Sequence, residues 1–166
     1  MTRPSLTGFL VFMLVAGAGR AAIPAPATGA TAVAAVLDRF HAAAARADSE
    51  TYFSLFAPEG VFLGTDASER WTVAEFRAYA LPYFSRGQGW TYVPQARHVV
   101  LAPQGDFAWF DELLESKSYG VCRGTGVLRQ VDGRWKICQY HLTLPIPNAL
   151  APKVVQLIRE APAQGK

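Results

Sequence analysis

The stretch GVCRGTGVLRQVDGRWKICQYHLT, residues 120–143, decides the fold of this chain. Small or apolar residues alternate with polar ones on both sides of Asp132–Gly133. An Asp-Gly pair between two alternating runs is typical of the two-residue turn of a β-hairpin. If Val131 pairs with Arg134 across this turn, the pairing continues outward one residue at a time, so that Gln130 pairs with Trp135 and so on along both strands. The stretch is therefore predicted to form two long antiparallel strands.

The glycines of this hairpin could in principle belong to a phosphate-binding loop. Such a loop needs glycines between a strand and the N-terminus of a helix, whereas Gly124 and Gly126 lie inside a strand, so that kind of site is excluded. The alternation puts both glycines on the same face as Trp135, Gln139 and His141, and we expect this face to be the inner one. Glycines there leave space for a ligand or for aromatic side chains of the helices, and both interpretations stay open.

The two cysteines, Cys122 and Cys138, are not expected to form a disulfide with each other. The predicted pairing puts Cys138 opposite Val127, five residues from Cys122 and on the other face of the sheet. Five strand residues span roughly 16 Å, whereas bridged Cα atoms lie within roughly 7 Å of each other. Each cysteine is therefore interpreted as a small buried apolar residue, because Cys122 as a nucleophile would need a base nearby.

Upstream of the hairpin, the hydrophobic pattern changes from helical spacing to alternation. The chain begins with three predicted helices, of which the third starts with a capping box at Thr72 and Glu75. The predicted helices are Val33–Ala47, Glu50–Phe56 and the segment from Thr72 to Phe84; the predicted strands before the hairpin are Val61–Leu63, Trp90–Val93, Arg97–Ala102 and Phe107–Glu115. Three N-terminal helices packed on a strongly curved antiparallel sheet make an α+β domain.

The N-terminus has the order of a secretory signal peptide. Residues 1–22 carry a basic start, the apolar run GFLVFMLVAGAG and small residues after it. A disordered linker is predicted over residues 23–30. Export through this signal predicts a secreted or periplasmic protein. Cleavage of the signal peptide removes two of the 16 basic residues and leaves 14 basic and 13 acidic residues in the mature chain. Because the mature chain is nearly neutral, neither nucleic acid nor a membrane is an expected partner.

Three segments of the chain resemble a known family. LFAPEGVFLGTD (residues 55–66), AWFDELL (108–114) and VDGRWKICQYHLTLPIPN (131–148) are similar to the SnoaL-like domain of the nuclear transport factor 2-like superfamily. The resemblance covers residues 31–148 and leaves a C-terminal helix and tail over 149–166. It implies a cone whose helices and sheet enclose an internal pocket, and a homodimer that forms through the outer face of the sheet.

The resemblance does not by itself settle the activity, because members of the superfamily isomerise, hydrolyse, cyclise or only bind and assemble. The catalytic residues of the ketosteroid isomerases match Phe40, Gly64 and the stretch from Gly124 to Gly126, none of which carries the required group. The pocket arginine of the calcium/calmodulin-dependent kinase association domain also matches Gly126. Whether this chain is an enzyme therefore stays open.

His141 is the first candidate for catalysis, because an imidazole can donate, accept or titrate near neutral pH. Asp111 and Glu112 are adjacent on a strand, so one of them should face the interior. An inward carboxylate near His141 would form an acid–base pair. The alternatives are a structural histidine and a carboxylate that is solvated or paired with Arg97 or Arg123.

The predicted function is the binding of a small, mostly apolar molecule in the cone. The alternatives are a pocket enzyme (an isomerase, hydrolase or dehydratase) that uses His141 with Asp111 or Glu112, and a dimeric assembly module without ligand. No cofactor or metal is predicted, because the three histidines lie far apart in the sequence and no metal-binding spacing is present. The predicted ligand-binding residues are Phe40, Trp71, Tyr79, Tyr83, Trp90, Trp109, Gly124, Gly126, Gln139 and His141.

Overall fold

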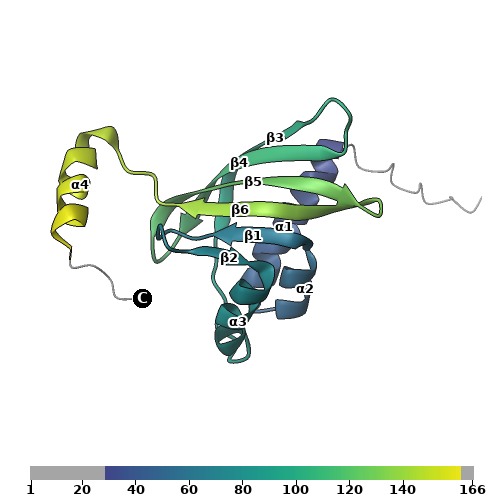
Figure 1. Cartoon of the computed structure of the whole chain (residues 1–166), viewed down its shortest axis with the longest axis horizontal. Helices are drawn as coiled ribbons and strands as arrows, with labels where there is room; N and C mark the ends of the chain where they lie inside the picture. Colours follow the sequence, from purple (N-terminus) through teal and green to yellow (C-terminus); the bar gives the residue numbers. More distant parts are fainter. Residues whose placement is uncertain (1–28, 162–166) are drawn as a thin grey trace, which may run out of the picture.

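A single mixed sheet forms the centre of the computed structural model, which describes residues 29–161. Its strands are β1 (Phe56–Leu63), β2 (Arg70–Thr72), β3 (Val93–Leu101), β4 (Phe107–Ser116), β5 (Gly120–Val131) and β6 (Arg134–Thr143). Their order in space is β2-β1-β6-β5-β4-β3. Strand β1 is parallel to β6, and the other neighbouring pairs are antiparallel (Figure 1). The signal peptide predicted at residues 1–22 lies outside the described residues.

Three helices, α1 (Gly29–Ala45), α2 (Ser49–Ser54) and α3 (Val73–Phe84), pack on the sheet (Figure 1). A short 3-10 helix η1 (Asn148–Leu150) and a fourth helix α4 (Ala151–Glu160) follow β6. The prediction of an α+β fold with three N-terminal helices on a curved sheet is confirmed. None of the helices within residues 29–161 has the length and apolar character that a membrane crossing requires.

Side chains at the helix starts explain where two of these helices begin. Asp48 caps α2 by accepting a hydrogen bond from the Thr51 backbone N–H at 3.0 Å. At the start of α3, Thr72 Oγ1 accepts from the Glu75 N–H at 3.3 Å, and the Glu75 carboxylate accepts from the Thr72 N–H at 2.8 Å. This is the capping box expected from the sequence, and it satisfies two otherwise free backbone donors.

The strands before the hairpin differ from the prediction in three places. Phe56 begins β1 rather than ending α2, and the pairing of β1 with β6 shifts between Phe56 and Val61. This irregularity accommodates the APEG sequence, which by itself resembles a turn. The short strand β2 was not predicted, and Trp90 to Tyr92 precede β3 as an irregular segment instead of forming a strand of their own.

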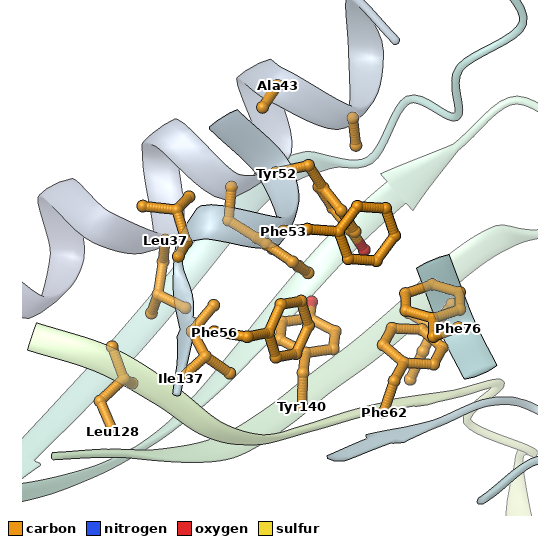
Figure 2. Close-up of a cluster of buried hydrophobic side chains, with 14 of the residues drawn as sticks. Leu37, Ala43, Tyr52, Phe53, Phe56, Phe62, Phe76, Leu128, Ile137 and Tyr140 are labelled. Carbon is orange, nitrogen blue, oxygen red and sulfur yellow. The ribbon is translucent and has the colours of Figure 1, made fainter. Parts of the chain in front are cut away.

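Aromatic side chains fill the space between the helices and the inner face of the sheet (Figure 2). Phe40 of α1 stacks on Tyr52 of α2 with ring centroids 4.4 Å apart, and Phe62 of β1 stacks on Phe76 of α3 at 4.0 Å. Tyr140 lies on the sheet side of the core in Figure 2, and its ring centroid is 4.8 Å from that of Phe40 and 5.9 Å from that of Phe62. Full burial of each such large side chain contributes roughly 1.5–3 kcal/mol to folding, so this cluster holds α1, α2 and α3 against the sheet.

A β-bulge at Cys138 changes which residues of β6 face the core. Leu128 pairs with Ile137, but the next residue of β5, Val127, pairs with Gln139, so Cys138 is an additional residue in β6. An additional residue reverses the alternation beyond it. Trp135 and Ile137 face inward as predicted, but after the bulge the buried residues are Tyr140 and Leu142. The predictions that Gln139 and His141 face inward and that Cys138 opposes Val127 are therefore wrong.

Strand β5 keeps the predicted alternation. Its buried positions include Cys122, Gly124, Gly126 and Leu128, all on the face toward the helices. Both cysteines are free thiols, with Cys122 buried and Cys138 partly exposed.

Candidate functional site

The cone opens at one end of the sheet into a cavity of about 200 Å³, which we call the mouth cavity. Its walls are mainly aromatic, with a few polar groups at the edge. The lining residues are Phe62, Gly64, Thr65, Glu69, Trp71, Phe76, Tyr79, Trp90, Tyr92, Tyr119 and Leu142. Ligand cavities are usually larger, about 300–1,000 Å³, whereas an apolar cavity of about 150 Å³ already binds benzene. The mouth cavity therefore suits a molecule with roughly one substituted ring.

A second, much narrower cavity lies deeper in the cone and has a volume of about 10 Å³. It shares Phe62, Trp90, Tyr92 and Leu142 with the mouth cavity, so the two have common walls. The other lining residues of this deep cavity are Phe40, His41, Ala44, Tyr52 and Tyr140. A space of this size holds at most about one water molecule. The deep cavity is thus a narrow extension beneath the mouth cavity. We call its lining, with the polar side chains of His41 and Tyr140, the floor of the cone.

Glu112 of β4 is fully buried behind this floor and accepts hydrogen bonds from three side chains. Its Oε1 atom accepts from His41 Nε2 at 2.7 Å and from the Tyr140 hydroxyl at 2.9 Å. Its Oε2 atom accepts from Arg97 Nε at 2.7 Å. These residues come from α1, β6 and β3, so the carboxylate joins three elements. Buried carboxylates need such partners because desolvation without them is very costly.

Arg97 connects this cluster to α1. Its Nη1 atom donates to Asp38 Oδ1 at 2.7 Å and to the Ala34 carbonyl oxygen at 3.1 Å. The third nitrogen of the guanidinium, Nη2, is buried and has no hydrogen-bond partner among the described residues. Arg97 therefore places a positive charge beside the buried Glu112, and it shares that charge with Asp38.

The charge state of the cluster follows from these contacts. Burial acts to raise the pKa of Glu112, but the hydrogen bonds and charges of His41 and Arg97 outweigh it and lower this pKa. Burial and the Glu112 charge raise the pKa of Tyr140 well above its ordinary value. Glu112 is thus an acceptor and Tyr140 a donor near neutral pH. His41 Nε2 is then the donor of the 2.7 Å hydrogen bond to Glu112.

The predicted catalytic residues are only partly brought together. Glu112 is the inward carboxylate, whereas Asp111 lies on the outer face, where its Oδ2 atom is 3.1 Å from His98 Nδ1. His141 lies on the outer face as well, where it lines a cavity of about 330 Å³ along the β1–β2 loop that shares Gly64, Thr65 and Glu69 with the mouth cavity. The predicted pair of His141 with an inward carboxylate is wrong, because the bulge at Cys138 turns His141 outward. His41 takes that place, and the Arg97 ion pair given as the alternative is present.

Of the predicted ligand-binding aromatics, Trp71, Tyr79 and Trp90 line the mouth cavity, while Phe40 and Trp90 line the deep cavity. Tyr83 lies beside Tyr79 with ring centroids 5.5 Å apart and is exposed.

Trp109, Gln139 and the two glycines do not contribute to either cavity. Trp109 is exposed on the outer face, where it belongs to the same row of paired residues as Gln139. A Cβ atom at Gly124 would lie 2.4 Å from the Tyr140 hydroxyl oxygen, and one at Gly126 would lie 2.8 Å from Phe110 Cε1. A Cβ atom at Gly126 would also lie 2.1 Å from the Gln139 backbone oxygen, so the two glycines make room for atoms of neighbouring strands, not for a ligand.

His41 and Tyr140 are site residues that were not predicted from the sequence, and Arg97 was expected only as an alternative ion-pair partner of the carboxylate. His41 had a detectable signal, since it lies four residues after Leu37 and three before Ala44, on the apolar side of α1. Tyr140 could not be placed without knowledge of the bulge. Within residues 29–161, no group of three or more His, Cys, Asp or Glu side chains is arranged to hold a metal ion.

The family comparison agrees with this geometry. A model of the SnoaL-like domain matches residues 33–147. The chain belongs to this family. No curated protein sequence matches the chain.

Solved structures share the fold of this SnoaL-like protein. A candidate association domain of calcium/calmodulin-dependent protein kinase II from Xanthomonas campestris is 27% identical, with a TM-score of 0.55, over 81% of this chain and 99% of that one. A candidate dehydratase of the nuclear transport factor 2-like family from Streptomyces avermitilis is 19% identical, with a TM-score of 0.57, over 71% and 96%. A candidate scytalone dehydratase from Novosphingobium aromaticivorans is 11% identical, with a TM-score of 0.59, over 70% and 83%.

Proposed function

We propose that this SnoaL-like protein binds a small, mostly apolar ring compound in the mouth cavity, with a polar group directed toward His41 and Tyr140. The observation that carries the proposal is the aromatic cavity above a floor whose two polar side chains are held by one buried carboxylate. Aromatic walls stack on an apolar ring, and a few fixed polar groups orient it. No cofactor is needed for such binding.

A binding experiment with defined probes tests this function. Single-ring phenols and cyclic ketones are titrated into the mature protein, and binding is measured by calorimetry and ligand-observed NMR. Replacing Trp71, which lines the mouth, by alanine is expected to weaken binding about tenfold, or about 1.4 kcal/mol. The matched control is Trp109→Ala on the outer face, which should bind like the wild type. Binding that is absent, or equally weakened in both variants, would refute the proposal.

Acid–base catalysis on the bound molecule is the second candidate function, favoured by the 2.7 Å contact between His41 and Glu112. A carboxylate that fixes the histidine tautomer leaves Nδ1 as a general base. His41 lines only the deep cavity, which holds about one water molecule. This base would therefore act through that water to remove a proton from a carbon beside a carbonyl, which begins an isomerisation or a dehydration. Two of the structural neighbours are candidate dehydratases, and dehydration belongs to this class of reactions. This proposal replaces His141 by His41 as the reacting residue.

Proton exchange distinguishes catalysis from simple binding. In D2O, an enzyme of this kind should exchange the protons beside the carbonyl of a bound cyclic ketone, which NMR or mass spectrometry detects. His41→Gln should abolish that exchange but still bind the ketone, and Asp111→Asn should exchange normally. Exchange that persists in His41→Gln would exclude His41 as the base.

Assembly and localisation complete the proposal. Val100, Phe107 and Trp109 are exposed apolar residues on the outer face of the sheet, and we propose that this face forms a homodimer. The likeness to a kinase association domain favours a dimeric assembly module as the alternative without ligand.

The signal sequence at residues 1–22 supports export to the periplasm or the medium. Fractionation, with the intact mass of the mature chain, tests export.

A further inference from the structure

Helix α4 has an apolar side with no partner on the sheet. At 3.6 residues per turn, its apolar residues gather on one side of the helix and its polar residues on the other. Leu157 and Ile158, on the apolar side, are 56% and 67% exposed. Figure 1 shows α4 standing away from the sheet, and it packs mainly against η1. An isolated helix of ten residues is only marginally stable in water, so the apolar side needs a surface to pack against.

The chain leaves β6 at the mouth of the cone. Leu142 lines both cavities. On one side of it, Leu63 pairs with His141, so the β1–β2 loop follows directly beside the end of β6. On the other side, Arg123 pairs with Thr143, so the β4–β5 turn with Tyr119 lies beside the continuation of the chain. Both neighbouring segments contribute residues to the mouth cavity.

The linker keeps α4 close to this opening. Residues 144–147 separate β6 from η1, and four residues span at most about 14 Å. Pro145 and Pro147 restrict this linker further because their φ angles are fixed. In Figure 1, α4 lies beyond the same end of the sheet as the β1–β2 connection. The nearest surface within the reach of α4 is thus the rim of its own mouth cavity.

The rim and the helix are chemically complementary. Tyr79 and Tyr119 line the mouth cavity and are 48% and 56% exposed. Their rings offer an apolar surface, and the carboxylate of Glu69 lies in the same lining. On α4, Lys153 and Arg159 border the apolar side at its two edges. Such residues can pack their alkyl parts against the rim while their charges approach a carboxylate.

From these observations we propose that α4 closes over the mouth cavity of its own chain as a lid. Its apolar side packs on Tyr79 and Tyr119, and the cavity is then shielded from water. The docking itself does not depend on a ligand. Its consequence, slower entry and release of the bound molecule, rests on the proposed binding function, because a lid must open before exchange occurs.

Hydrogen exchange of the mature protein tests the docking. The backbone amides of α4 should be protected in the wild type and exchange about tenfold faster in Leu157→Asp, because an undocked helix opens readily. Gln156→Lys is the control: it introduces a charge at the adjacent residue on the polar side, where a lysine can still contact Glu160, and it should keep the protection. Equal exchange in the wild type and Leu157→Asp would overturn the proposal.

A second pair of variants identifies the surface that the helix covers. Tyr119→Ala at the rim should remove the protection of α4, whereas Trp109→Ala on the outer face should not. If protection depends on protein concentration and disappears with dimer dissociation, a second copy is the occupant and the lid is refuted. If Trp109→Ala removes protection and Tyr119→Ala does not, the helix covers the outer face, which also refutes it.

Ligand kinetics separate the lid from the proposed function. In stopped-flow measurements with 4-methylphenol, Leu157→Asp should raise the association and dissociation rates together relative to Gln156→Lys. Equal rates in the two variants would contradict the lid. If 4-methylphenol and the other ring probes do not bind, the proposed function fails, while the exchange experiment still decides whether α4 docks on the rim.

Discussion

At the scale of single residues, the Glu112 carboxylate has three hydrogen-bond donors and no contact with solvent. Glu112→Gln keeps the shape of the side chain but removes the charge that compensates Arg97. We expect it to lower the free energy of unfolding by about 3 kcal/mol, as is typical when one partner of a buried pair is lost. Urea denaturation measures this loss. Asp111→Asn, the neighbour on the outer face, is the control and should change stability by less than about 0.5 kcal/mol.

The same carboxylate predicts a specific loss of stability in acid. The pKa of Glu112 is lowered in the folded protein from its ordinary value of 4.5, so the unfolded chain takes up this proton at higher pH than the native one. Its contribution is fully present above the unfolded pKa and is lost as the pH falls through the lower, folded pKa. The stability difference between wild type and Glu112→Gln should therefore be constant near neutral pH and shrink below about pH 4. A difference that stays constant to about pH 3 would contradict the lowered pKa.

A methyl group added at Gly124 would collide with the hydrogen-bonded cluster around Glu112. A Cβ atom there would lie 2.4 Å from the Tyr140 hydroxyl oxygen, so Gly124→Ala should cost about 1–3 kcal/mol by overpacking. Tyr140→Phe removes that oxygen, and the double variant should recover about 1 kcal/mol relative to additivity. Thermal or urea unfolding of the four proteins gives this coupling.

Gly126 and Phe110 form the control pair for this double-mutant cycle. A Cβ atom at Gly126 would lie 2.1 Å from the backbone oxygen of Gln139, besides its contact with Phe110. Truncating Phe110 cannot move this backbone atom, so Phe110→Ala should not rescue Gly126→Ala. If Gly124→Ala is rescued no better than Gly126→Ala, the close contact with Tyr140 is not the cause of its cost.

At the scale of elements, the bulge in β6 decides which side chains reach the cone. Deleting Cys138 would remove the bulge and leave Leu128–Ile137 and Val127–Gln139 as consecutive pairs, so Tyr140 and Leu142 would still face the core. We therefore expect the deletion variant to keep a cooperative thermal transition, which circular dichroism would show. Cys138→Ala retains the additional residue and should fold with a stability close to that of the wild type. A deletion variant without a cooperative transition would mean that the bend of the strand at the bulge is itself needed to close the sheet on the helices.

The bulge also marks the limit of what the sequence could predict about the site. The hairpin turn, the capping box at Thr72 and the inward direction of Gly124 and Gly126 depend on local patterns, and the structure agrees with each of them. The direction of His141 depends on pairing with β5 over a longer range, where one additional residue reverses every later side chain. No local feature of KICQY marks Cys138 as that residue.

At the scale of the whole molecule, the order of elements was enough to predict an α+β domain with a curved sheet, because three helices followed by long alternating strands allow few other arrangements. The cone was predicted from the resemblance to the SnoaL-like domain. The parallel pairing of β1 with β6 could not be read from the order of elements, since this pairing joins segments far apart in the sequence. The polar floor was missed for the same reason. His41, Arg97, Glu112 and Tyr140 come from four different elements and meet only after the sheet has curved around α1.

The outer face of the sheet carries the last prediction, which concerns the assembly. Trp109 is 49% exposed and pairs with Val100 on β3 and Val127 on β5, so the three form a row across the sheet. We expect the mature protein to be a dimer in light scattering at micromolar concentration, because burying this row removes apolar surface from water. Trp109→Glu should yield a monomer, since each interface would then contain two unpaired carboxylates. Tyr83→Glu, at a comparably exposed aromatic residue on α3, is the control and should remain dimeric. A wild type that stays monomeric, or a Trp109→Glu variant that stays dimeric, would exclude the outer face as the interface.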